Sequence, residues 1–224
     1  MRQTFDEQAD PSFGSKHLPL IRAEMTRQGL DGFLIPHEDE HQNEYLPDAN
    51  ERLAWATGFT GSAGAALVLA DRAAVFVDGR YTLQVKDQVD TALFETLDLM
   101  DGGVPAYLEA AAKSGQVIGY DPKLVSPDGL ARLIAAATRA GAVLKPVEPN
   151  PVDAAWGAAR PPQPSAPVVP HPLDYAGEDS AGKRARLGED LAAWGADAAV
   201  ITAPASFSAS KYQVADWAGS TNTF

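Results

Sequence analysis

The chain has 224 residues, more than the roughly 100–200 residues of a single domain but fewer than two full domains of about 150 each. Hydrophobic residues make up 45% and charged residues 21%, a globular composition that excludes a fully disordered chain. The 30 acidic and 18 basic residues give a formal net charge of −12, which disfavours nucleic acid and anionic membranes as partners.

The first expected elements are a helix and a short strand. Apolar residues over 18–25 recur with helical period, and Gly29 stands where a helix C-cap is expected. The apolar run over 32–35 is too short for a buried helix and predicts a buried strand.

A polar, acidic loop over 37–50 comes next and leads to a helix over 51–57. Two apolar runs, over 65–70 and 73–77, are separated by only two residues. This pattern predicts a β-hairpin.

The rest of the first domain alternates helices and strands. We expect a helix over 78–89, a strand over 93–97, a helix over 104–113, a strand over 116–120, a helix over 127–140 and a strand over 142–147. The pattern indicates an α/β domain over 1–158, with a mixed six-stranded sheet and flanking helices.

A proline-rich segment follows this domain. Six of the thirteen residues over 160–172 are proline, a composition that favours extended polyproline conformation. We interpret 159–173 as a semi-rigid linker. Beyond it, 183–194 predicts a helix ended by Gly195, and 197–201 predicts a strand.

This second helix and strand repeat the first pair. Placing Gly195 on Gly29, an offset of 166, also aligns four further positions: Leu187 with Ile21, Leu191 with Met25, Asp197 with Asp31 and Ile201 with Ile35. Two unrelated helix–strand units remain an open alternative, because such units are common. On the repeat interpretation, 174–224 is the incomplete start of a second, similar domain. The tail over 202–224, rich in Ser, Thr, Ala and Asn, is expected to be poorly ordered or packed opportunistically.

Gly58, Gly61 and Gly64 form a G-x-x-G-x-x-G pattern. It precedes a strand, whereas a dinucleotide-binding pattern follows a strand and opens a helix. We therefore favour a tight helix-to-strand passage in which larger side chains would clash, with Ser62 capping or turning it.

The acidic loop raises the question of a metal site. Glu38, Asp39, Glu40, His41 and Glu44 lie within seven residues, and carboxylate with imidazole suits zinc or manganese. The spacing matches no helix-borne ligand pair, so we favour a solvated or cleft-lining loop. No G-x-S-x-G context joins serine, histidine and acid, so hydrolysis by this chain alone is not expected.

Asp78-Gly79-Arg80-Tyr81 lies where a strand is expected to end and a helix to begin, a place where polar groups tend to face a crevice. Asp78 is predicted to cap the helix while Arg80 pairs with a carboxylate. We favour this structural role over direct ligand contact.

The absence of cysteine excludes disulfides and thiolate sites and fits a reducing compartment. Residues 1–14 lack the basic start and apolar stretch of a signal peptide, and no 18-residue apolar run occurs. We expect a soluble, cytoplasmic protein.

Several motifs, in this order and spacing, resemble the N-terminal, creatinase-like domain of Xaa-Pro aminopeptidase (aminopeptidase P). They are Ile35-Pro36, His41-Gln42-Asn43-Glu44-Tyr45, Gly58-Phe59-Thr60-Gly61-Ser62-Ala63-Gly64 and Asp78-Gly79-Arg80-Tyr81. The similarity continues through 119–122, 150–153, Trp156 and 171–177, and covers roughly residues 17–205. The form resembled has two creatinase-like domains before a C-terminal pita-bread metallopeptidase domain.

The resemblance implies removal of the N-terminal residue from peptides whose second residue is proline, by a water that bridges two metal ions, usually manganese. In the family the five metal ligands lie in the pita-bread domain, beyond residue 224, so no catalytic residue, metal ligand or cofactor is assigned to this chain. The family's N-terminal domains pack against the catalytic domain, shape access to its cleft and contribute to dimer contacts. The candidates for this supporting role are His41, Glu44, Tyr45, Arg52, Asp78, Arg80 and Tyr81.

The sequence therefore predicts the non-catalytic N-terminal portion of a cytoplasmic Xaa-Pro aminopeptidase, with the missing catalytic domain as its partner and a homodimer as its assembly. The alternative is a standalone creatinase-fold module that binds peptides or proteins without hydrolase activity. Hydrolysis of creatine-like compounds or proline dipeptides is disfavoured, because those relatives have only two domains. After Pro204 the sequence departs from the family pattern, and a truncated chain, a frameshifted product and a natural fragment all stay open.

Overall fold

The structure is a computed structural model that describes residues 9–167, 169 and 172–201. The chain divides into two compact units, with the boundary between Pro162 and Gln163. Within the described residues, no helix is long and apolar enough to cross a membrane.

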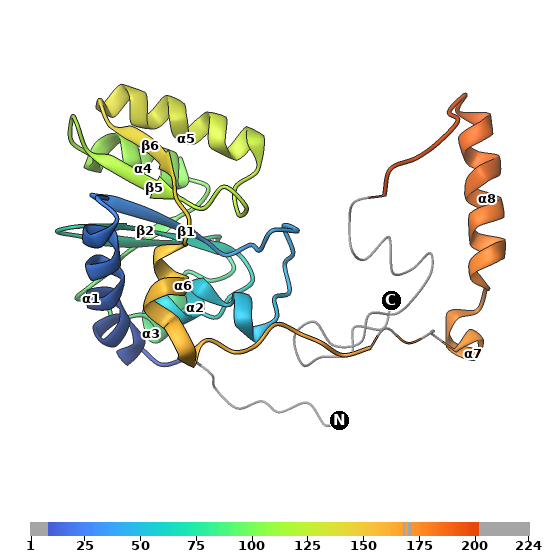
Figure 1. The fold of residues 1–224 in the computed structure, drawn as a ribbon, viewed down its shortest axis with the longest axis horizontal. Helices are drawn as coiled ribbons and strands as arrows, with labels where there is room; N and C mark the ends of the chain where they lie inside the picture. The colour runs from blue at the N-terminus through green and yellow to red at the C-terminus, as the bar shows by residue number, and fades with distance from the viewer. Residues whose placement is uncertain (1–8, 168, 170–171, 202–224) are drawn as a thin grey trace. The chain divides into compact units, whose positions relative to one another are not determined.

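Unit 1 is built on one six-stranded sheet with the order β4-β3-β2-β1-β5-β6 (Figure 1). The strands are β1 Gly32–Pro36, β2 Gly64–Leu69, β3 Ala73–Val77, β4 Glu95–Asp98, β5 Val117–Tyr120 and β6 Val143–Pro146. β2 runs antiparallel to both β1 and β3, whereas the pairs β1 with β5, β3 with β4, and β5 with β6 are parallel. The predicted mixed six-stranded sheet and its β-hairpin are confirmed.

Helices cover both faces of the sheet (Figure 1). The helices of unit 1 are α1 Ser12–Arg27, α2 Arg52–Thr57, α3 Gln84–Gln88, α4 Gly103–Ala111, α5 Pro127–Ala140 and α6 Pro151–Trp156, with short 3-10 turns at Asp48–Asn50 and Gly157–Ala159. Side chains of α1, α2 and α6 share one buried cluster, and those of α4 and α5 share another. The sheet therefore lies between two helical layers, the arrangement that buries both of its faces.

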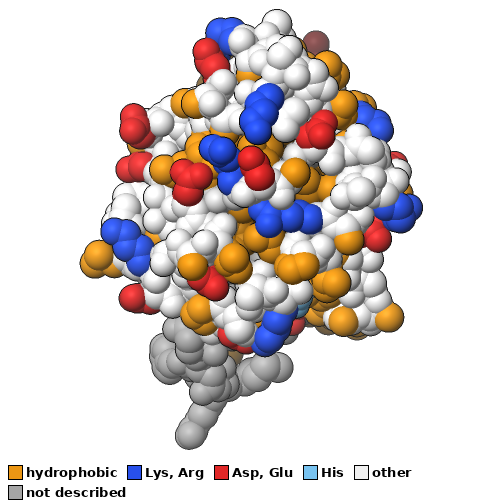
Figure 2. Space-filling model, turned by 90° about the vertical axis from the view of Figure 1, so that its left-hand side faces the viewer, with side chains coloured by type: hydrophobic (Ala, Val, Ile, Leu, Met, Phe, Trp, Pro, Cys, Tyr) orange, Lys and Arg blue, Asp and Glu red, His pale blue; other side chains and the backbone are white. Residues whose placement is uncertain are grey.

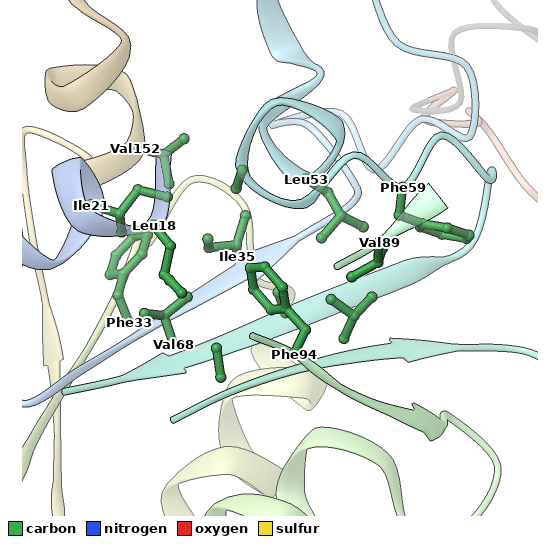
Figure 3. Packing of buried hydrophobic residues seen from close by; sticks show 14 of the residues in the cluster. Leu18, Ile21, Phe33, Ile35, Leu53, Phe59, Val68, Val89, Phe94 and Val152 are labelled. Atoms are coloured by element: carbon green, nitrogen blue, oxygen red, sulfur yellow. The ribbon is translucent and has the colours of Figure 1, made fainter. Parts of the chain in front are cut away.

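Alternation along the strands distributes the core between the two layers. In β1, Phe33 and Ile35 belong to the cluster under α1 and α2, whereas Leu34 belongs to the cluster under α4 and α5. Successive side chains of a strand point to opposite faces, so an unbroken apolar run marks a strand covered on both sides. Figure 3 shows Phe33 and Ile35 packed near Leu18 and Ile21.

Local capping explains why α5 matches its predicted bounds. The Ser126 hydroxyl accepts a hydrogen bond from the Gly129 N–H, Pro127 occupies the first turn, and Gly141 ends the helix with φ of 72°. Each device satisfies or removes backbone groups that a helix end leaves unpaired.

Two predicted helix boundaries in unit 1 are wrong. α1 begins at Ser12, well before the expected start near Leu18, and the Asp10 carboxylate accepts hydrogen bonds from the Ser12 N–H and hydroxyl at 2.9 and 2.6 Å. The helix expected from Asp78 begins only at Gln84, and its N-cap residue makes no side-chain capping bond. Asp78 does not cap that helix, because its carboxylate is bound by Arg80 in a turn.

Unit 2 contains a short helix, α7 (Leu173–Ala176), and a longer helix, α8 (Ser180–Ala193). Asp179 caps α8 by accepting a hydrogen bond from the Gly182 N–H at 2.6 Å, and no residue of α8 is buried.

The predicted strand over 197–201 is wrong. These residues have no strand conformation, no described segment pairs with them, and Val200 is 91% exposed. A strand requires a neighbour for its backbone N–H and C=O groups, so the apolar run alone does not form one. The tail over 202–224, expected to be poorly ordered, lies outside the described residues.

Candidate functional site

Three connecting segments meet at one edge of the sheet. β2 is antiparallel to its neighbours, and the register places Pro36 opposite Ala65 and Gly64 opposite Val77. The loop after β1, the glycine turn before β2 and the turn after β3 therefore lie side by side. This edge carries the carboxyl ends of the parallel strands, where open α/β sheets place their ligand-binding residues.

Ser62 links two of the predicted site residues across this edge. Its Oγ lies 2.9 Å from Glu44 Oε1 and 2.9 Å from the Tyr81 hydroxyl. Ser62 has one hydroxyl proton, so when it donates to the Glu44 carboxylate it accepts from Tyr81. The result is a directed chain from Tyr81 through Ser62 to Glu44.

Arg80 and Asp78 complete this group, which we name the Glu44 cluster: Glu44, Ser62, Asp78, Arg80 and Tyr81. Arg80 donates to Asp78 from Nε at 3.0 Å and from Nη2 at 2.7 Å, and its guanidinium lies 5.1 Å from the centroid of the Tyr81 ring. The prediction that Arg80 pairs with a carboxylate is confirmed, although the carboxylate is that of Asp78.

The opposite charges of Asp78 and Arg80 shift each other's pKa. The hydrogen bond from Arg80 holds the pKa of the Asp78 carboxyl below its usual value, and the same bond raises the pKa of the Arg80 guanidinium, with a smaller contribution from Glu44. The Arg80 side chain remains 60% exposed. The cluster thus presents an ionised guanidinium and the Glu44 carboxylate to solvent, a pair suited to orienting a polar ligand rather than to nucleophilic attack.

The glycine pattern determines how closely these segments approach. A Cβ on Gly58, where φ is 91°, would lie 2.5 Å from the Gln88 carbonyl oxygen, and one on Gly61 would lie 2.3 Å from the Phe59 ring and 2.9 Å from that of Tyr81. The predicted tight passage is confirmed. Glycine at Gly61 lets the Tyr81 ring pack edge-on against Phe59, at a centroid distance of 5.5 Å, beside Ser62.

Hydrogen bonds to the buried Asp39 carboxylate hold the conformation of the loop after β1. The buried Asp39 carboxylate accepts hydrogen bonds from the His41 N–H at 2.9 Å and from the Asn43 side chain at 3.0 Å. His37 Nε2 lies 2.9 Å from the Glu44 carbonyl oxygen. The His41 and Tyr45 side chains are exposed on this loop, outside the hydrogen bonds of the Glu44 cluster.

The loop does not match a metal site. In the part of the chain that the structure describes, no three or more His, Asp or Glu side chains gather closely enough to hold a metal ion. Amide donors already occupy both oxygens of Asp39. The residues of this loop therefore do not fit a metal ion, and the family resemblance itself places its two ions in the pita-bread domain.

Arg52 lies in a separate group. Its Nε and Nη2 donate to Asp153 at 2.7 and 3.0 Å, and Arg160 donates to the same carboxylate at 2.8 Å. The structure therefore brings together Glu44, Asp78, Arg80 and Tyr81, and pairs Arg52 with Asp153 instead. The sequence analysis did not predict that Ser62 links Glu44 to Tyr81; the only signal was a hydroxyl inside a glycine-rich turn. It also did not predict that Asp153 pairs with Arg160; the only signal was two opposite charges on either side of a tryptophan.

Comparison with known families identifies two consecutive matches. Residues 18–154 match a model described as the creatinase/prolidase N-terminal domain, and residues 159–208 match a second model with the same description. A probable Xaa-Pro aminopeptidase P of Neurospora crassa is 36% identical over 198 residues, and one of Sordaria macrospora is 38% identical over 181 residues. The matches cover 85% and 78% of this chain but only 28% and 29% of the relatives. The chain thus spans less than a third of the length of these relatives.

Solved structures support the same assignment. The X-prolyl aminopeptidase of Caenorhabditis elegans, described as a cytosolic enzyme with a di-nuclear active site, matches with a TM-score of 0.74 at 27% identity over 88% of this chain and 34% of that one. The N-terminal domain of the cytoplasmic peptidase PepQ from Mycobacterium tuberculosis matches with a TM-score of 0.50 at 25% identity, over 62% of this chain and 98% of that one. The sheet, its flanking helices and the family match over most of unit 1 show that this chain belongs to the creatinase/prolidase N-terminal domain family.

Proposed function

We propose that this chain is the non-catalytic N-terminal portion of an Xaa-Pro aminopeptidase, whose intact form releases the N-terminal residue from peptides with proline in second position. The observation that carries the proposal is the pair of consecutive creatinase/prolidase N-terminal matches, in a chain similar to less than a third of each aminopeptidase P. In this proposal the two metal ions of the intact enzyme, and the residues that hold them, belong to a domain outside these 224 residues.

Within this function, the Glu44 cluster supports the rim of the substrate cleft, together with His41 and Tyr45. It lies at the carboxyl edge of the sheet, its guanidinium is exposed, and hydrogen bonds fix its geometry. Arg52 contributes from a distance, by holding α2 against α6 through Asp153.

A chimera tests the scaffold role. The matching segment of the Neurospora crassa protein is replaced by this chain, and release of the first residue from a peptide with proline in second position is measured with manganese. We expect activity from the chimera and none above a metal-only control from the 224-residue chain alone. Turnover by the chain alone contradicts the proposal, and a folded but inactive chimera favours the standalone binding module.

The same chimera tests the Glu44 cluster. Arg80→Gln removes the exposed guanidinium, and we expect a KM at least threefold higher with an unchanged kcat, because the residue orients substrate without touching the reacting atoms. Arg139→Gln on α5, which breaks an exposed ion pair with Glu109 on α4, is the matched control. Equal KM values for both variants would contradict a role of the Glu44 cluster at the substrate cleft.

Location and assembly are part of the proposal. We place the intact enzyme in the cytoplasm, supported by a relative described as cytosolic and by a sequence without cysteine. We also propose a homodimer. Light scattering of the chain and of the chimera measures the mass directly, and a monomeric chimera contradicts this part.

A further inference from the structure

The end of unit 1 is held by two arginines that share one carboxylate. Asp153 on α6 binds Arg52 on α2 through both carboxylate oxygens, at 2.7 and 3.0 Å, and Arg160 Nη1 lies 2.8 Å from Asp153 Oδ2. We name Arg52, Asp153 and Arg160 the Asp153 joint. The Arg52 side chain is only 7% exposed, and those of Asp153 and Arg160 are 21% and 22% exposed, so solvent screens these pairs little.

Arg160 makes further contacts inside unit 1. Its Nε donates to the Ala49 carbonyl oxygen at 2.7 Å, and its Nη2 lies 3.4 Å from Asn50 Oδ1. One guanidinium therefore contacts both α6 and the short turn before α2. This number of contacts fixes both the position and the plane of the guanidinium.

The backbone at Arg160 is constrained as well. Pro161 and Pro162 follow directly, and a residue before proline is restricted to extended conformations. Arg160 has φ of −64° and ψ of 128°, and its N–H donates to the Gly157 carbonyl oxygen at 3.2 Å. Proline fixes the local torsions, whereas the side-chain contacts connect this residue to α6 and to the turn before α2.

α6 is itself anchored, so the joint rests on a rigid base. Val152 is fully buried in the core under α1, and the Trp156 ring stacks on Trp55 at a centroid distance of 5.2 Å. The Asn150 side chain caps the helix by accepting from the Val152 N–H at 2.9 Å. The joint thus links a fixed helix to the first residue of the proline segment.

We propose that the Asp153 joint fixes the direction in which the proline connector leaves unit 1, with Arg160 as the positioning residue. Arg52 already binds both oxygens of Asp153, so Asp153 does not need Arg160 as a partner. Arg160 instead connects Asp153 to the point where the chain leaves unit 1. The proline residues then carry this direction outward, because polyproline conformation is semi-rigid over several residues. This role is independent of catalysis by any further domain.

Distances between two spin labels test the proposal. The chain has no cysteine, so Ala135→Cys on α5 and Ser165→Cys in the connector can be labelled specifically. We expect one narrow distance distribution in the labelled parent and a distribution at least twofold wider after Arg160→Gln. Lys123→Gln, which breaks an exposed pair with Glu148, is the control and should leave the width unchanged.

Two further variants separate direction from folding. Arg160→Gln leaves the Arg52–Asp153 pair intact, so we expect unchanged circular dichroism, a cooperative unfolding transition, and a smaller loss of stability than Asp153→Asn causes. Arg160→Lys keeps the charge but loses the planar fork, and should give an intermediate width. A parent distribution as wide as that of Arg160→Gln, or a narrow one in both, overturns the proposal, because the prolines alone would then decide the direction.

Discussion

α1 and α8 end in the same way, 166 residues apart, yet only α1 belongs to a packed core. The N–H groups of Gln28 and Trp194 each bond to the carbonyls three and four residues earlier, and the N–H groups of Leu30 and Ala196 return to Met25 and Leu191, both at 2.9 Å. Gly29 and Gly195 have φ of 67° and 69°. The shared C-cap supports the internal repeat.

The two regions differ in everything that requires distant residues. Ile21 and Met25 of α1 are at most 1% exposed, whereas α8 has no buried residue. After Gly29 the chain forms β1, paired with β2 and β5, whereas 197–201 has no strand. A cap is made by a few neighbouring residues, and a strand or an apolar helix face is completed only by segments far along the chain.

The largest expected effect comes from truncating the aligned apolar pair. Ile21→Ala should lower the free energy of unfolding by about 3 kcal/mol, since it leaves a cavity in a closed core. Leu187→Ala, its aligned control, should change it by less than about 0.5 kcal/mol, because its side chain is not fully buried. Urea unfolding measures both. Equal losses would show that the face of α8 is covered in solution.

The second prediction concerns the ion pair between Arg52 on α2 and Asp153 on α6, in the same layer as α1, whereas α8 has no buried residue. Asp153→Asn should cost about 2 kcal/mol in the free energy of unfolding, because Arg52 would stay buried without its carboxylate. Arg52 Nη1 already lacks a hydrogen-bond partner among the described residues. Glu109→Gln, in an exposed pair with Arg139, should cost less than about 0.5 kcal/mol. A similar loss in both variants would contradict the special role of burial.

The third prediction uses the shared caps. Alanine at either glycine should cost about 1 kcal/mol locally, because an L side chain disfavours positive φ. For Gly29→Ala this loss should appear in global unfolding. For Gly195→Ala it should appear only as faster amide exchange in the last turn of α8. A global effect of Gly195→Ala would mean that the two units unfold together.

The smallest effect is a pH dependence confined to unit 1. Burial raises the pKa of the Glu51 carboxyl, although nearby His37 opposes the shift. A raised folded-state pKa means that the burial is tolerated at low pH and costs stability as pH rises through that pKa. Glu51→Gln should therefore match the parent near pH 4 and exceed it by less than about 1 kcal/mol near neutral pH. Urea midpoints across this pH range measure the difference. If the midpoints of the parent and of Glu51→Gln change with pH in the same way, burial of the Glu51 carboxylate does not reduce stability.

Much of unit 1 was predictable because its signals are local. The apolar run at β1, the paired runs at β2 and β3, and the Ser126 and Gly141 ends of α5 each specify an element without reference to the rest. The prediction failed at Asp78, where a preference for helix caps competed with Arg80 two residues away. It failed again at 197–201, where the pattern was strand-like but the neighbours were missing.

The candidate site was only partly predictable. The motifs named Glu44, Asp78, Arg80 and Tyr81, and the structure joins them at one edge of the sheet. The atom that links Glu44 to Tyr81 is the hydroxyl of Ser62, supplied by a third segment that the antiparallel register of β2 brings alongside. No spacing in the sequence encodes that register.

The surface charges are also only partly predictable from the sequence. On the face drawn in Figure 2, acidic and basic side chains are interspersed and hydrophobic side chains lie between them. The net charge of −12 predicts the general repulsion of polyanions, but not where individual charges pair.

The sequence by itself determined the helix α5, the strands of unit 1, the caps at Gly29 and Gly195, and the family, because these depend on the identity and order of neighbouring residues. Only the tertiary structure decided that Ser62 joins Glu44 to Tyr81, that Arg52 and Arg160 share Asp153, and that the strand-like run after α8 forms no strand. Each of these depends on which distant segment lies alongside, and hydrogen bonds and burial act only over a few ångströms.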